Sequence, residues 1–117
     1  MHCLVVSSAL FFIPATIAFI KRKVFRACAI FMLSALSITN HSHVFGVWAN
    51  WLDTVYVRTI VTCFTYHGLI ISTPLTYLGC MCTLMAAYCY WKRRKTTYHV
   101  YMHMIGTIGF IFYVYAI

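Results

Sequence analysis

Residues 96–117, TTYHVYMHMIGTIGFIFYVYAI, are mostly apolar over a length that suits one membrane-crossing helix. About 20 such residues span the hydrocarbon core of a bilayer. Two histidines, His99 and His103, interrupt the run. Their spacing places both imidazoles on one face of a helix. Polar groups inside a membrane helix are costly, so the pair is expected to have a partner or a function.

The composition of the whole chain also favours a membrane environment. Of the 117 residues, 63% are hydrophobic and 9% are charged, whereas a soluble domain carries about 25% charged residues. Asp53 is the only acidic residue, and the formal net charge is +8. The length allows a single domain, residues 1–117. We therefore expect an integral, multi-pass membrane protein in contact with membrane lipids.

Charges, turns and prolines divide the apolar regions into about five spans. This division predicts an all-α, polytopic transmembrane helix bundle. The expected spans are residues 4–20, 24–43, 53–71, 74–91 and 98–117. Residues 1–20 lack the basic start of a signal peptide and are read as the first membrane helix. Pro14 is expected to bend this span, and Pro74 to open the fourth. Trp48 and Trp51 are expected in an interfacial loop between the second and third spans.

Apart from Arg58, the basic residues form two clusters, within residues 21–26 and 92–95, which flank apolar spans. One cluster falls on each side of a five-span bundle, so the positive-inside rule does not choose an orientation. An excess of basic residues in a membrane protein reflects topology and attraction to anionic lipids. Aromatic and basic residues do not alternate as they do where single-stranded nucleic acid is bound, so no nucleic-acid partner is expected.

Following the five spans across the bilayer brings polar residues to one side. The second span ends, and the third and fifth begin, on the same side. The polar residues expected to meet in that leaflet are Ser37, His41, Asp53, His99 and His103. His43 is expected to face elsewhere or to lie in the loop, and His67 to lie towards the opposite side with a structural role.

The histidines are compatible with a metal site, a haem site or hydrogen bonding between helices. Catalytic zinc takes three protein ligands, with nitrogens at about 2.0–2.1 Å. His99 and His103 offer two such ligands, and His41 is the natural third. For Asp53, the alternatives to a catalytic role are pairing with Arg58 or with interfacial water. A lone membrane serine such as Ser37 usually bonds its own backbone.

The motifs S-x-x-x-H at residues 37–41, an aspartate in WLDTVYV and H-x-x-x-H at residues 99–103 together resemble a known superfamily. It joins the alkaline ceramidases, the adiponectin and progestin receptors and haemolysin-III-like proteins. The resemblance implies zinc held by His41, His99 and His103. It also implies that Ser37 and Asp53 bind or activate a water molecule. Family members have seven helices, and the loss of two from this chain would keep the histidines on one side.

This resemblance implies a minimal zinc-dependent intramembrane hydrolase of lipid amides such as ceramide, with Asp53 as general base and Ser37 positioning the water or the developing oxyanion. The alternative is a non-catalytic membrane subunit that works with other membrane subunits, in a respiratory complex or a virion membrane. The segment NHSHVFG, followed by Leu52 and Asp53, is similar to the haem-ligating segment in the membrane anchor of succinate dehydrogenase, and this similarity keeps a haem or quinone-site anchor among the alternatives.

Overall fold

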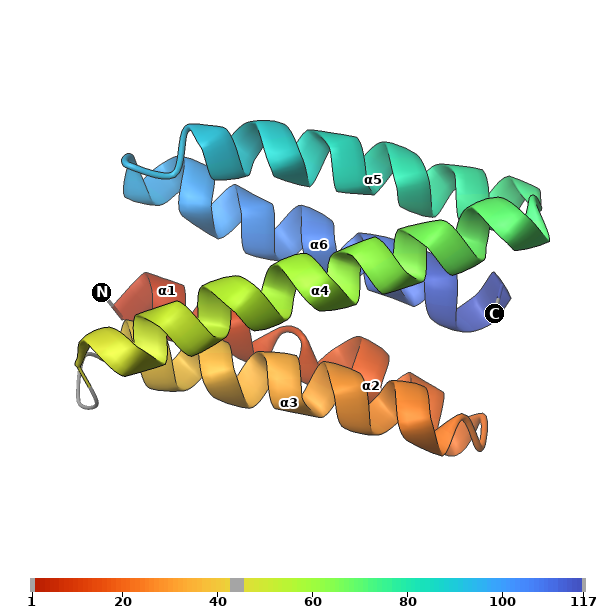
Figure 1. The fold of residues 1–117 in the computed structure, drawn as a ribbon, viewed down its shortest axis with the longest axis horizontal. Helices are drawn as coiled ribbons and strands as arrows, with labels where there is room; N and C mark the ends of the chain where they lie inside the picture. The colour runs from red at the N-terminus through yellow and green to blue at the C-terminus, as the bar shows by residue number, and fades with distance from the viewer. Residues whose placement is uncertain (1, 43–45, 117) are drawn as a thin grey trace.

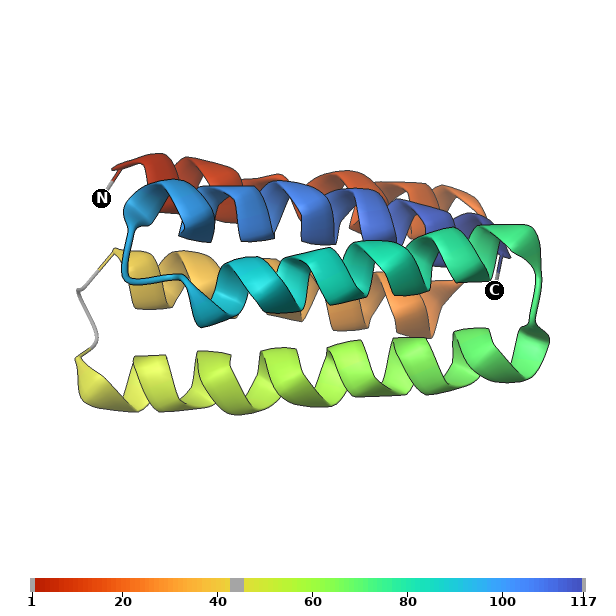
Figure 2. The same cartoon turned by 90° about the horizontal axis from the view of Figure 1, so that it is seen from above.

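The computed structural model of the protein describes residues 2–42 and 46–116, and these residues form α-helices and no strand (Figure 1). The all-α prediction is therefore confirmed. The helices are α1 (His2–Ala9), α2 (Phe12–Ile20), α3 (Val24–His41), α4 (Val47–Ile71), α5 (Pro74–Trp91) and α6 (Thr96–Ala116). All run along the 38 Å long axis (Figures 1 and 2).

The helices are arranged around α3 and α6. The first two, α1 and α2, follow one another along the bundle and pack against both α3 and α6. α5 packs along α6, and α4 lies at the edge of the bundle, in contact with α3 and α5 (Figure 2). The turn between α5 and α6 and the start of α4 therefore lie at the same end as the end of α3 (Figure 1).

The first apolar segment is broken between α1 and α2, at Leu10 and Phe11. The predicted bend thus lies four residues before Pro14, and the chemistry of proline explains its position. A proline in a helix has no N–H to donate to the carbonyl four residues earlier, and its ring clashes with that carbonyl. Short i to i−3 hydrogen bonds replace the helical ones, from the Leu10 N–H to Ser7 O and from the Phe11 N–H to Ser8 O.

The third predicted span begins earlier than expected. α4 starts at Val47, so Trp48 and Trp51 lie in its first turns and the prediction of a loop at these two residues is wrong. Gly46, with a φ of 77°, turns the chain into α4. Helical hydrogen bonding satisfies the backbone of this segment, which an interfacial loop would have left to water. His43 lies outside the described residues.

The predicted start of the fourth span is confirmed. Pro74 occupies the first turn of α5, and the Thr73 side chain accepts a hydrogen bond from the backbone N–H of Thr76. The Thr76 hydroxyl in turn accepts from the Thr73 backbone N–H at 2.9 Å, which completes a capping box. Ser72 ends α4 in the left-handed conformation, with a φ of 53°.

Three helical segments are long and apolar enough to cross a membrane: Cys3–Ile20, Val24–His41 and Val47–Ile71. This agrees with a membrane protein. Among the described helices, α5 and α6 do not meet these criteria of length and apolar composition. Three of the five expected spans are therefore supported in this way. Both helices carry several tyrosines, and α6 also carries the two histidines. The surface is rich in large apolar side chains, with Phe25 92% exposed and Trp91 80% exposed.

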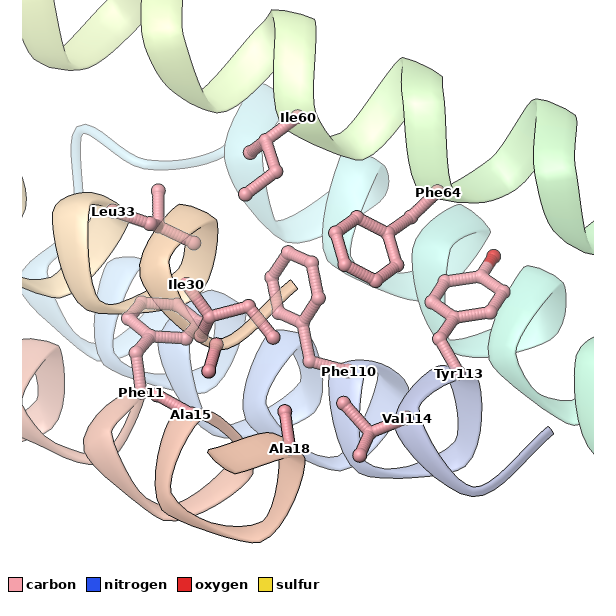
Figure 3. Close-up of a cluster of buried hydrophobic side chains, with 11 residues drawn as sticks. Phe11, Ala15, Ala18, Ile30, Leu33, Ile60, Phe64, Phe110, Tyr113 and Val114 are labelled. Carbon is pink, nitrogen blue, oxygen red and sulfur yellow. The ribbon is translucent and has the colours of Figure 1, made fainter. Parts of the chain in front are cut away.

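The core joins α2, α3, α4 and α6 (Figure 3). Ala15, Ala18 and Ala27 are fully buried, and side chains this small let α2 approach its neighbours closely. Tyr113 fills the space where α4 and α5 each present a glycine. A Cβ added to Gly79 would lie 2.6 Å from Tyr113 Cε1, and one added to Gly68 would lie 2.9 Å from the same atom.

We predict that Gly79→Ala lowers the free energy of unfolding by about 1–3 kcal/mol, because the added methyl group overpacks a site already filled by the buried Tyr113 ring. Gly106→Ala is the matched control. Its new Cβ would meet Phe11 at 3.4 Å, and alanine favours a helix over glycine by about 1 kcal/mol. Thermal unfolding in detergent checks both variants. Equal stability of the two would contradict this account of the packing.

Candidate metal centre

Three histidines meet at the end of the bundle where α3 finishes and α6 begins. His41 is the last residue of α3, and His99 and His103 lie in the first two turns of α6. The His41 ring centroid is 4.6 Å from that of His99 and 5.3 Å from that of His103. The two rings of α6 are 4.8 Å apart. The helical period stacks His99 and His103, and the chain path through α3 adds His41.

The donor set fits a metal ion such as zinc. Each ring offers one nitrogen, and the three nitrogens all lie within 4.8 Å of one another. Nitrogens that share one zinc at 2.0–2.1 Å in a tetrahedral shell lie about 3.4 Å apart. Small rotations of the side chains would close the difference. Among the residues that the structure describes, this group contains histidines only, which leaves room for a non-protein ligand in a tetrahedral shell.

Ser7 is a partner of the site that the sequence analysis did not identify. Its Oγ lies 2.7 Å from Nδ1 of His103 and 3.1 Å from the Leu4 carbonyl oxygen. In the tautomer that suits metal binding, the Nδ1–H of His103 donates to Ser7 Oγ and the Ser7 hydroxyl donates to the Leu4 carbonyl. Nε2 of His103 then keeps the lone pair that a metal needs.

The break between α1 and α2 also shapes the site. Phe11 packs edge-on against His103, with ring centroids 5.7 Å apart, and is itself 5% exposed. Together with Ser7, it buries the His103 ring to 2% exposure. A ring held by packing and by a hydrogen bond on its second nitrogen is pre-oriented for ligation.

Ser37, which was predicted as a catalytic residue, lies in a buried cluster of serines. Its Oγ is 2.7 Å from Ser8 Oγ, and Ser8 Oγ is 2.7 Å from the Leu4 carbonyl oxygen. Either hydroxyl of the Ser8–Ser37 pair can be the donor. Ser34 donates to the Ser8 carbonyl at 2.8 Å. Ser37 is thus hydrogen-bonded within the bundle, to a residue of α1.

Asp53, the other predicted catalytic residue, lies in the second turn of α4 and is held from α3. Its carboxylate accepts a hydrogen bond from the Asn40 amide at 3.0 Å. Asn40 precedes His41, so one turn of α3 contributes to the metal group and orients the carboxylate. The sequence analysis missed Asn40 because its partner is known only once α3 and α4 are packed together.

A cavity of about 250 Å³ adjoins the site and extends between α3, α4, α5 and α6. Ser37, Asp53, His99 and His103 border it, whereas His41 is not part of its wall. Most of the remaining wall is apolar. Apolar wall residues include Phe11, Leu33, Val57, Val61, Met102 and Phe110. His67 is exposed on the last turns of α4 and belongs to neither the metal group nor the cavity wall.

The comparisons with known proteins give no match to this chain among family models, curated proteins or solved structures. The resemblance to the ceramidase and haemolysin-III-like superfamily therefore rests on the motif residues and stays a prediction.

We predict about one zinc per chain after purification without chelators, and loss of that zinc in His99→Ala, which removes one of three ligands. His67→Ala is the matched control and should keep the metal, because His67 lies outside the group. Elemental analysis checks both variants. Loss of zinc from both, or no zinc in the unmodified protein, would contradict the site.

A second prediction concerns the tautomer of His103. Ser7→Ala removes the acceptor of the Nδ1 proton and should weaken zinc affinity about 10- to 100-fold, the usual effect of losing a partner behind a ligand. Ser72→Ala, an exposed serine outside the metal group, should leave the affinity unchanged. Competition with a zinc indicator measures both variants. Unaltered affinity in Ser7→Ala would show that Ser7 does not support His103.

Proposed function

We propose that the protein is a multi-pass membrane protein and a zinc-dependent hydrolase of acyl-lipid amides. One observation carries the proposal: the three-histidine group adjoins an apolar cavity that is also bordered by Asp53, the only acidic side chain of the chain. Pockets with apolar walls and a few convergent polar groups are typical of ligand sites. The three apolar helices and the apolar exterior support a location in the bilayer.

His41, His99 and His103 would hold the zinc. When bound, zinc polarises a carbonyl oxygen and makes water more acidic. The residues around the histidines supply the other parts of a hydrolytic site. Asp53 can take a proton from water, and the Asn40 amide keeps its carboxylate oriented. The apolar wall would hold the acyl chain and exclude bulk water.

Ser37 keeps in this proposal the role that the resemblance implies. Its Oγ is 2.7 Å from Ser8 Oγ, and the residue borders the cavity. There it would position a water molecule or the developing oxyanion. Membership of the ceramidase and haemolysin-III-like superfamily remains part of the proposal, supported by the order and spacing of the five motif residues.

We predict that Asp53→Asn retains zinc but lowers turnover of a lipid amide by about 100-fold or more, the scale expected for loss of a general base. The amide preserves size and hydrogen bonding but cannot take up the proton. Thr54→Val, at the next position on the cavity wall, is the control and should keep most of the activity. Release of fatty acid from a panel of N-acyl lipids measures turnover. Zinc binding without turnover by the unmodified protein would favour the alternative of a non-catalytic subunit with a structural metal.

A further inference from the structure

Two arginines from different parts of the chain converge on one tyrosine. Arg58, on α4, donates from Nη2 to the Tyr90 hydroxyl at 3.2 Å, and its Cζ lies 5.8 Å from the centroid of that ring. Arg93 follows α5, and its Cζ lies 4.1 Å from the same centroid. Arg93 also donates to the Tyr90 carbonyl oxygen at 3.0 Å. All three residues line the cavity that adjoins the histidines.

This group carries positive charge that the chain does not balance. Arg58 belongs to an apolar helical segment, Val47–Ile71, and charges in such segments usually mark pairing or function. The only acidic side chain, Asp53, accepts from Asn40, and no ion pair joins it to an arginine among residues 2–42 and 46–116. The ring of Tyr90 offsets part of the charge through cation–π contacts. An anion beside the ring would offset the mutual repulsion of the two guanidinium groups.

The arginine pair, Arg58 and Arg93, and the histidines reach the cavity from different helices. Tyr90 and Arg93 lie at the end of α5 and in the turn that follows, and Arg58 reaches them from α4. His99 and His103 line the same cavity from the first turns of α6. Phe110 is two to three turns further along α6 and belongs to the apolar core. The cavity wall therefore joins a cationic part, two histidines and an apolar part.

We propose that Arg58, Arg93 and Tyr90 bind the oxyanion headgroup of a single-chain N-acyl lipid, such as an N-acylated amino acid. Arginine is well suited to this role because its planar guanidinium donates paired hydrogen bonds to carboxylate or phosphate. The acyl chain would occupy the apolar part, and the amide would lie level with the histidines. A cavity of about 250 Å³ suits one chain rather than two.

The identification of this lipid as a substrate rests on the proposed function, whereas its binding does not. In the reaction, one water molecule is consumed and the amide C–N bond breaks. The hydroxyl oxygen joins the acyl carbon to give a fatty acid, and the nitrogen gains a proton to give a free amine. No oxidant or further reactant is required. The anionic headgroup bound by the arginine pair stays on the amine product, so the arginine pair selects the leaving group.

Equilibrium binding to the full chain in neutral nanodiscs, after removal of metal with a chelator, tests the site without catalysis. N-dodecanoylglycine and N-dodecanoylethanolamine share a chain and an amide and differ in the carboxylate. We expect the glycine conjugate to bind at least about 10-fold more tightly, the scale of a charge-assisted hydrogen bond. Arg58→Gln and Arg93→Gln should each remove most of that preference. Arg94→Gln, the same charge change at an exposed neighbour outside the cavity wall, should retain it.

Other outcomes decide against the site. Equal binding of the charged and neutral lipids would overturn it. An equal loss in Arg93→Gln and Arg94→Gln would assign the preference to diffuse charge. Binding of N-acetylglycine as tight as that of the dodecanoyl compound would show that the cavity holds no chain.

Dodecyl phosphate tests whether phosphate is the preferred oxyanion, and a preference for either oxyanion over the neutral lipid supports the site. Anion preference with no amide hydrolysis in the zinc-loaded protein would keep this site and overturn the proposed function.

Discussion

His103 is a buried imidazole, and a buried imidazole needs hydrogen-bond partners or a ligand. To meet this need, helices from distant parts of the chain pack together around its ring. It is 2% exposed, and its contacts come from Ser7 and Phe11 at the N-terminal end and from His41 and His99. These contacts join α1, α3 and α6 at one end of the molecule. In an apolar surrounding, loss of the hydrogen bond to Ser7 would leave a buried ring nitrogen without that partner, so the packing of α1 beside α6 is coupled to the site.

The break before Pro14 lies beside this site, at Leu10 and Phe11. Ser7 contacts His103, Ser8 contacts Ser37, and Phe11 packs on His103. A proline bend in a membrane helix is tolerated when neighbouring groups satisfy the freed backbone. Here the Leu10 carbonyl, which Pro14 cannot bond, accepts from the Ile13 N–H at 3.0 Å.

Polar and apolar side chains share the wall of the cavity. His99, His103, Asp53 and the arginine pair line it together with Phe110 and Tyr113 of the apolar core. The hydroxyl of Tyr113 lies 3.3 Å from Thr65 and 3.2 Å from Thr83, so this polar atom is paired within the core. A wall of this kind would suit an amphiphile, and the proposed lipid would contact both the metal group and the arginine pair.

The helical class, the start of α5 at Pro74 and the face with two histidines could be predicted from the amino-acid sequence, because helix propensity, proline chemistry and the helical period are local. The sequence also led to the expectation that His41 and Asp53 lie near that face, since apolar spans alternate in direction. The partners became known from the packed helices: Ser7 for His103, Ser8 for Ser37, Asn40 for Asp53 and Tyr90 for Arg58. The serine of the first pair is 96 residues from its histidine. Such contacts depend on how helices rotate and pack against one another, and the pattern along one helix carries no record of the face its neighbour presents.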